Sequence, residues 1–181
     1  MRLSKAKLIK LLKPRLESLR YVEFKDSRSG FQGLFVKKVN TDFYLSLGLT
    51  IHRYYDSAFT GDFYLSKNTI IGATWGDIPG DSYKRPGFLL TKDERSIYYT
   101  DEINVEGSYN ICWDGNNADS IDDFLKVIET TEPRFINQID LFNKIEHSKE
   151  IAILSTHAKA VKKIIATNKI EGSYSFYLSK K

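Results

Sequence analysis

The chain has 181 residues, of which 41% are hydrophobic, 13% aromatic and 28% charged. These values are typical of a folded globular protein and exclude the disordered and collagen-like classes. No window holds 18 consecutive apolar residues, which excludes a transmembrane helix, and the N-terminus lacks the apolar core of a secretory signal. The one cysteine, Cys112, cannot form an intramolecular disulfide or a cysteine-built metal cage. We therefore expect a cytoplasmic protein in which residues 1–181 form a single domain.

Charge is distributed unevenly along the chain. The formal net charge is +4, but residues 1–38 carry +8, residues 39–130 carry −8 and residues 131–181 carry +4. Between residues 93 and 123, nine acidic residues stand against one basic residue, Arg95. Segregation of this kind affects steering and the choice of partner more than it affects the fold.

The N-terminus predicts a basic amphipathic helix. Its leucines recur at helical spacing (Leu8, Leu11, Leu12, Leu16 and Leu19), and Ser4 precedes them as a suitable N-cap. Pro14 interrupts this pattern and lacks the backbone N–H that a helix needs. We expect a kink at Pro14 or two short helices.

From Tyr21 onward the apolar period changes to two, which predicts strands. The clearest alternation covers residues 42–52, where one face carries Phe43, Leu45, Leu47, Leu49 and Ile51. Further strands are predicted at 21–25, 31–39, 61–66, 70–75, 96–100 and 107–113, with a loop over 76–87.

Helical spacing returns in the C-terminal part. Ser120 and Asp123 resemble a capping box, and a second helix begins near Thr131 with Pro133 in its first turn. A third helix carries apolar residues over 151–165 and is expected to end at Asn168. A last strand is expected at 173–179. This order predicts an α+β fold, a mostly antiparallel sheet with an N-terminal helix and with C-terminal helices packed on one face.

Residues that carry chemistry match no catalytic or metal-binding motif. The three histidines lack zinc-motif spacing, and residues 114–119 lack the glycine and glutamate of a calcium loop. Cys112 lies beside Trp113, a setting that favours a buried thiol. Glu23 and Lys25, joined by Asp42 or Asp62, could form a nuclease-like set, but acid-x-lysine pairs are common on strands by chance and an exposed strand face is the favoured explanation. The sequence therefore favours a non-enzymatic protein without cofactor or metal.

Two features favour binding to another protein. A dense acidic surface speeds docking of a basic partner, and the acidic candidates are Asp101, Glu102, Glu106, Asp114, Asp119, Asp122 and Asp123. Aromatic residues are common at interface hot spots, and a predicted loop region carries Tyr54, Tyr55, Phe59 and Trp75. Solvated acidic loops and aromatic core residues are the alternative explanations.

Three short motifs lie within residues 8–100: Leu12-Lys-Pro14, Ser46-Leu-Gly-Leu49 and Phe59-Thr-Gly-Asp-Phe-Tyr-Leu-Ser66. In this order they resemble a group of small bacterial α+β domains of unknown function. Some domains of this kind are immunity proteins found beside secreted toxins, so the resemblance implies neutralisation of a toxin. It implies no catalytic residue.

Three functions therefore remain open, and the third is a structural or oligomeric module with no small ligand. The first is a non-enzymatic protein-binding domain, such as an immunity protein that neutralises a basic toxin. The alternative is a nucleic-acid-binding protein or nuclease-like enzyme that contacts phosphates through the basic N-terminal helix. The basic residues of that helix are Arg2, Lys5, Lys7, Lys10, Lys13 and Arg15. A solvated polar helix face explains the same pattern.

Overall fold

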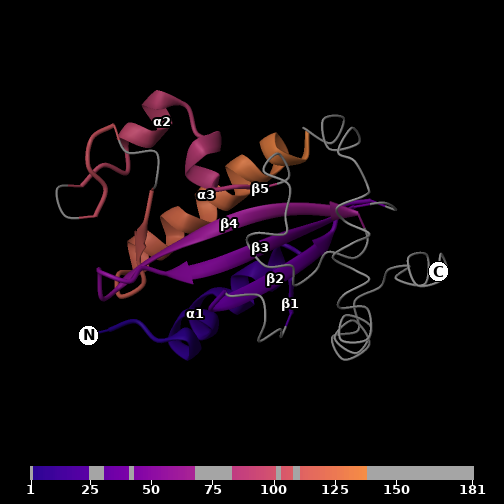
Figure 1. Ribbon diagram of the computed structural model, residues 1–181, viewed down its shortest axis with the longest axis horizontal. Coiled ribbons are helices and arrows are strands. Elements are labelled where there is room, and N and C mark those ends of the chain that lie inside the picture. Colours follow the sequence, from indigo (N-terminus) through magenta and orange to yellow (C-terminus); the bar gives the residue numbers. More distant parts are fainter. Residues whose placement is uncertain are drawn as a thin grey trace.

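A computed structural model describes residues 2–24, 31–40, 43–67, 83–100, 103–107 and 111–137 (Figure 1). The helices are α1 (Lys5–Ser18), the 3₁₀ helix η3 (Pro86–Leu89), α2 (Lys92–Ser96) and α3 (Ala118–Ile136). The strands are β1 (Val22–Glu23), β2 (Gly33–Lys38), β3 (Phe43–Ile51), β4 (Ala58–Lys67), β5 (Tyr83–Lys84) and β6 (Trp113–Asp114).

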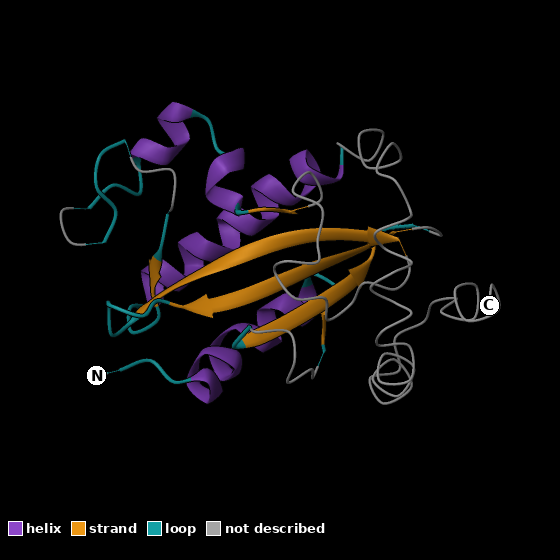
Figure 2. Ribbon diagram, viewed as in Figure 1, coloured by secondary structure: helices purple, strands orange, loops and turns teal. Residues whose placement is uncertain are grey.

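The strands form one antiparallel sheet in the order β1-β2-β3-β4-β5, and β6 pairs with β4 on the edge that β4 shares with β5. Helices α1 and α3 lie behind this sheet in the view of Figure 2. The α+β fold predicted from the sequence is confirmed.

The main core lies between the helices and the first face of the sheet. Leu8, Leu12 and Leu16 of α1 and Phe124 of α3 are fully buried against the apolar residues of β2, β3 and β4. The ring of Phe124 meets Phe59 and Trp113 edge-on, with centroid distances of 5.0 and 4.9 Å. Such aromatic contacts add to the free energy gained from area burial.

The second face of the sheet is also buried. It carries a separate apolar cluster of Phe24, Phe31, Leu34, Val36, Tyr44 and Tyr64. The alternation over residues 42–52 correctly predicted the first face, where Phe43, Leu45, Leu47 and Leu49 are buried. The alternation did not predict that the second face is buried as well. Tyr44 and Ser46 occupy the polar positions of the alternating pattern, which are expected to face solvent, but both residues are buried.

Helix α1 continues through Pro14, so the alternative of two short helices is wrong. Pro14 removes only the bond to the Lys10 carbonyl, and both residues are exposed, so water can reach that carbonyl. Leu12 and Leu16 hold the helix to the core on either side of the proline. Ser4 caps α1 as predicted, because its hydroxyl accepts a hydrogen bond from the Lys7 backbone N–H (3.2 Å).

Helix α3 also begins and ends elsewhere than predicted. Its N-cap is Asn117, whose side chain accepts a hydrogen bond from the Asp119 backbone N–H (2.9 Å), while the Ser120 hydroxyl accepts one from Asp114. The helix does not restart near Thr131 but runs through Pro133, because Thr131 and Phe135 are buried and keep the last turns packed.

Several strand predictions are wrong. Residues 96–100 form no strand, since Thr91 and Glu94 make a capping box that starts α2. In the described part of 107–113, only Trp113 belongs to a strand, and the predicted loop at 76–87 holds β5 and the start of η3 at its C-terminal end. The predictions for 70–75, 151–165 and 173–179 lie outside the described residues, so a single domain over 1–181 stays a prediction.

The C-terminus of α1 provides a stability test. Arg20 adopts a left-handed conformation (φ 69°), with the Tyr21 N–H bonded to the Leu16 carbonyl and the Arg20 N–H to the Glu17 carbonyl. Glycine adopts this conformation without steric cost, so Arg20→Gly should raise the free energy of unfolding by about 0.5–1 kcal/mol in urea denaturation. Arg20→Ala removes the same charge but keeps the strain. An equal gain in both variants would contradict this explanation.

A second stability test concerns Gly48 in β3. A Cβ atom at this position would lie 2.7 Å from the ring of Phe31, closer than real Cβ contacts. Gly48→Ala should therefore lower the free energy of unfolding by about 1–3 kcal/mol through overpacking. In a double-mutant cycle, Phe31→Leu should recover part of this loss, because the smaller side chain makes room. Purely additive losses would show that the two residues do not compete for space.

Candidate protein-binding site

The turn between β3 and β4 (residues 52–57) projects from one end of the sheet and is anchored at three points. The His52 backbone N–H bonds to the Ala58 carbonyl (2.7 Å), and Leu3 donates to the Asp56 carbonyl (2.7 Å). Gly115, ahead of α3, donates to the Ser57 carbonyl (2.8 Å). The N-terminal segment, the hairpin turn and the start of α3 therefore meet at this end (Figure 1).

Two tyrosines are exposed on this anchored turn. Tyr54 is 80% exposed and Tyr55 46% exposed, and the guanidinium of Arg53 lies 5.9 Å from the Tyr54 ring centroid. The ring of His52 contacts both tyrosine rings, with centroid distances of 5.9 and 4.8 Å. The prediction that Tyr54 and Tyr55 are exposed aromatic residues is in agreement with this arrangement. Phe59, grouped with them in the sequence, is instead a core residue of β4 with no exposed surface.

Two of the predicted acidic residues lie at the same end. Asp114 pairs with Ala58 across β4 and β6, and Asp119 is exposed in the first turn of α3. Asp56 in the turn is also exposed, whereas Asp114 is half-buried. The turn and the N-terminal segment also carry exposed basic residues, which are Arg53, Arg2 and Lys5. We use the name docking end for one set of residues: His52, Arg53, Tyr54, Tyr55, Asp56, Asp114 and Asp119. Its charge is mixed rather than purely acidic.

The other predicted acids do not join one patch. Asp122 forms an ion pair with Arg15 of α1, and Asp123 pairs with Lys126 one turn along α3 (3.2 Å). Glu106 is exposed in the 103–107 loop, which Asn104 attaches to Cys112 through two side-chain hydrogen bonds of 2.8 Å. Asp101, Glu102 and Trp75 lie outside the described residues.

The basic residues of α1 are partly engaged within the chain. Lys7 donates to the Asn116 side chain, Lys13 pairs with Glu23 (2.9 Å) and Glu17 (3.8 Å), and Arg15 pairs with Asp122. Hydrogen bonding to Glu23 is the main cause that raises the pKa of Lys13. These contacts leave less positive charge on α1 for phosphate groups.

The nuclease-like set of carboxylates is separated by the sheet. Glu23 pairs with Phe35, Phe35 with Leu47 and Leu47 with Phe63, so Glu23 shares the first face with these residues. Asp62 precedes Phe63 in β4 and lies on the opposite face. Lys25 and Asp42 lie outside the described residues.

Asp62 belongs to a buried polar group on the second face. It is fully buried, and Arg85 Nε donates to its Oδ1 at 2.9 Å. Burial is the main cause that raises the pKa of the neighbouring Cys112 thiol to about 11, with Arg85 opposing and Asp62 adding to this rise. The Cys112 thiol therefore remains protonated at neutral pH and is unsuited to nucleophilic attack.

A second buried polar group joins α3 to the β1 end of the sheet. Tyr21 donates its hydroxyl hydrogen to Glu132 Oε2 (2.7 Å), and Lys37 pairs with the other oxygen of the same carboxylate. Lys37 also donates to the Leu19 carbonyl (3.3 Å). Burial, followed by the charge of Glu132 and the hydrogen bond to it, raises the pKa of Tyr21 well above its ordinary value. Every group in this arrangement has a structural partner.

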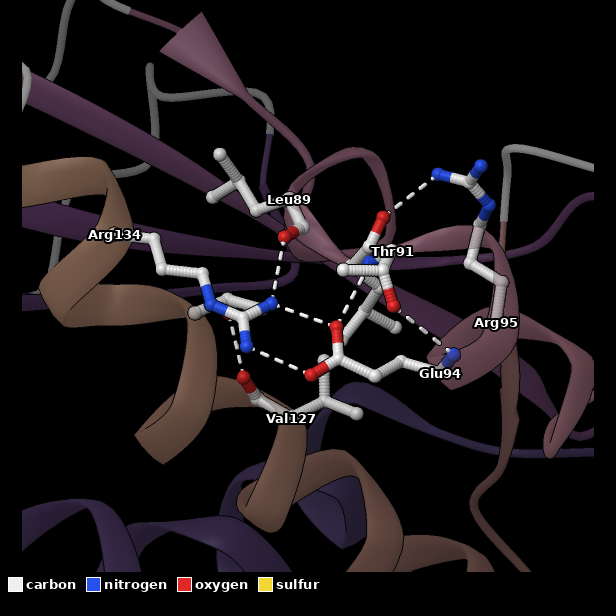
Figure 3. A network of polar contacts seen from close by, with 8 residues as sticks. Leu89, Thr91, Glu94, Arg95, Val127 and Arg134 are labelled. Atoms are coloured by element: carbon white, nitrogen blue, oxygen red, sulfur yellow. Dashed lines mark hydrogen bonds and ion pairs between the residues drawn. The ribbon is translucent and has the colours of Figure 1, made fainter.

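Figure 3 shows a third polar network, between α2 and α3. Arg134 binds Glu94 through two nitrogens, at 2.7 Å each, and donates to the Leu89 carbonyl at 3.0 Å. Glu94 also accepts a hydrogen bond from the Thr91 backbone N–H (2.8 Å). The hydrogen bond from Arg134 is the main cause that lowers the pKa of Glu94 to about 2. Bidentate pairing of this kind is strong and fixes geometry.

Within the described residues no group of three or more histidine, cysteine, aspartate or glutamate side chains could hold a metal ion. None of the described helices is both long enough and apolar enough to cross a membrane.

Sequence reasoning missed His52, Arg53 and Asp56 as parts of the docking end. The signal for them was the polar run that directly follows the long alternating strand, typical of an exposed hairpin turn. Comparison with known proteins adds nothing to this site: no family model matches the sequence, and no curated protein or solved structure is significantly similar to it.

The Glu94–Arg134 pair predicts a pH-dependent contribution to stability. The pKa of Glu94 is lower in the folded chain (about 2) than its ordinary value of 4.5, so its contribution is complete above pH 4.5 and is lost as the pH falls toward 2. Glu94→Gln should lower the free energy of unfolding by about 1 kcal/mol at pH 7, because the bidentate pair is partly exposed. The difference from the native chain in urea denaturation should shrink below pH 4.5.

Asp93→Asn is the matched control for this pair. It removes a carboxylate from the same first turn of α2 and leaves Arg134 with its partner. We expect a smaller effect for this control. A difference between Glu94→Gln and the native chain that stayed constant between pH 7 and pH 3 would contradict the assigned role of Glu94.

Proposed function

We propose that the chain is a non-enzymatic protein-binding domain whose docking end inserts Tyr54 and Tyr55 into a partner protein. The observation that carries this proposal is the exposure of both tyrosines on a turn that is fixed at three points. Tyrosine gives a large contact area with few rotatable bonds, and an anchored turn loses little conformational entropy on binding.

The partner that fits best carries basic residues around an apolar pocket. Asp56 is exposed in the same turn as the tyrosines, and Asp119 is exposed in the first turn of α3, shortly after Gly115, which is bonded to the turn. These two acids would pair with such basic residues at the rim of the interface. The resemblance to bacterial domains that include immunity proteins favours a toxin as this partner. An immunity protein of this kind would act in the cytoplasm, where it would cover the toxin's working surface.

The contacts of the chemically reactive side chains support binding rather than catalysis. In the described part of the chain, Cys112 is a protonated buried thiol and the carboxylates of Glu94 and Glu132 are held in ion pairs. Arrangements of this kind stabilise the fold. The engaged basic residues of α1 likewise weaken the alternative of phosphate binding.

The test compares capture by the native chain and by the Tyr54→Ala, Tyr55→Ala double variant, each tagged and exposed to lysate of the cells that produce the protein. A protein captured in stoichiometric amount is then purified and its affinity measured by calorimetry. The double variant should bind at least about 30-fold more weakly, as expected for a hot spot of 2 kcal/mol.

Ile97→Ala is the matched control, because Ile97 is 75% exposed and lies at the end of α2 rather than in the turn. It should bind like the native chain. Equal losses in both variants would contradict a specific role of the turn, and capture of nucleic acid that survives moderate salt would favour the alternative function.

A further inference from the structure

The ring of His52 lies at the centre of the docking end. Its Nδ1 accepts a hydrogen bond from the Tyr54 backbone N–H at 3.2 Å. The same ring contacts the rings of Tyr54 and Tyr55, and the His52 backbone N–H is bonded to the Ala58 carbonyl. His52 therefore has a fixed backbone at the end of β3, and its side chain reaches both exposed tyrosines.

The bond to Tyr54 requires one form of the imidazole. Nδ1 accepts a hydrogen bond only when the ring is neutral and carries its hydrogen on Nε2. A protonated ring carries hydrogens on both nitrogens, so two N–H groups would then face one another. Imidazole side chains change between these forms in the range from about pH 5 to pH 8.

We propose that His52 is a positioning residue of the docking end, which holds Tyr54 in place while its ring is neutral and releases Tyr54 when the ring is protonated. Tyr55 behaves differently, because its contact with the ring persists in both forms. The consequence for binding rests on the proposed function: a partner that needs both tyrosines binds more weakly in acid. The hydrogen-bond change itself occurs in the free chain.

The charged residues of the turn and of the segments bonded to it come from three parts of the chain. Arg53 and Asp56 lie in the turn itself. Arg2 lies in the N-terminal segment, next to Leu3, whose N–H donates to the Asp56 carbonyl. Asp114 lies in β6, opposite Ala58 of β4. Whatever the charges on these residues, protonation of the ring places a hydrogen on Nδ1 and removes the acceptor of the Tyr54 N–H.

The test is an NMR titration of the ¹⁵N-labelled full chain, without partner, from pH 8 to pH 5. At pH 8 the His52 ring should carry its hydrogen on Nε2. On acidification the Tyr54 amide proton should shift upfield with the same midpoint as the His52 ring, because it loses its acceptor. The Trp113 indole signal serves as a control for the intact core.

Two variants separate this mechanism from a general effect of acid. His52→Asn keeps an acceptor at the same place, since an asparagine Oδ1 bonds to the N–H two residues on, and does not titrate. Its Tyr54 amide should stay at the high-pH position throughout. His52→Phe keeps the ring contacts without the acceptor, and its Tyr54 amide should stay near the low-pH position.

Two results would overturn the proposal: a His52 ring that carries its hydrogen on Nδ1 at pH 8, or a Tyr54 amide that does not follow the ring's titration. Neither result depends on a partner, so they are distinct from a failure of the proposed function. A coupled titration together with unchanged capture by the Tyr54→Ala, Tyr55→Ala variant would keep the role of His52 and remove the docking role.

Discussion

The register of the β3–β4 hairpin is the constraint on which the rest of the structure depends. The two strands pair from Phe43 with Lys67 to Ile51 with Phe59, and both faces are buried near the middle. A slip by one residue would move Asp62 and Tyr64 to the helix side and Phe63 to the other face. Because neither exchange fits the packing, the hairpin fixes where β2, β5 and β6 attach and where the turn projects.

The uneven charge of the sequence has a partly structural explanation. Helices α1 and α3 lie parallel, since Lys7 contacts Asn116, Arg15 contacts Asp122 and Tyr21 contacts Glu132. The basic N-terminal segment therefore meets the acidic middle segment along these helices. Each exposed pair contributes little to stability by itself. Together the pairs engage charges that the sequence alone would assign to a protein or nucleic-acid partner.

Local patterns predicted strands β1 to β4 and helix α1, but they could not predict contacts between residues distant in sequence. The alternation from Phe43 to Ile51 is compatible only with a strand. The aromatic residues Tyr98 and Tyr99 also suggested a strand, but the capping box at Thr91 starts a helix just before them. Pro133 suggested a helix start because packing of Phe135 cannot be seen in a sequence. At the candidate site, the exposure of Tyr54 and Tyr55 was predictable. The attachment of their turn to the residues ahead of α3 was not, since it depends on the Gly115–Ser57 hydrogen bond and on the short pairing of β4 with β6.

The combination of exposure and fixation sets the β3–β4 turn apart from an ordinary hairpin loop. Loops that only connect strands are commonly polar and mobile, and exposed aromatic rings there gain nothing from burial. Here the backbone of the turn is bonded to the N-terminal segment, to β4 and to the residue ahead of α3, while Tyr54 remains exposed. Because folding already orders the backbone of this turn, a partner that buried the Tyr54 ring would not have to order that backbone again. In the proposed binding role, more of the free energy gained from burying the ring would therefore remain as affinity.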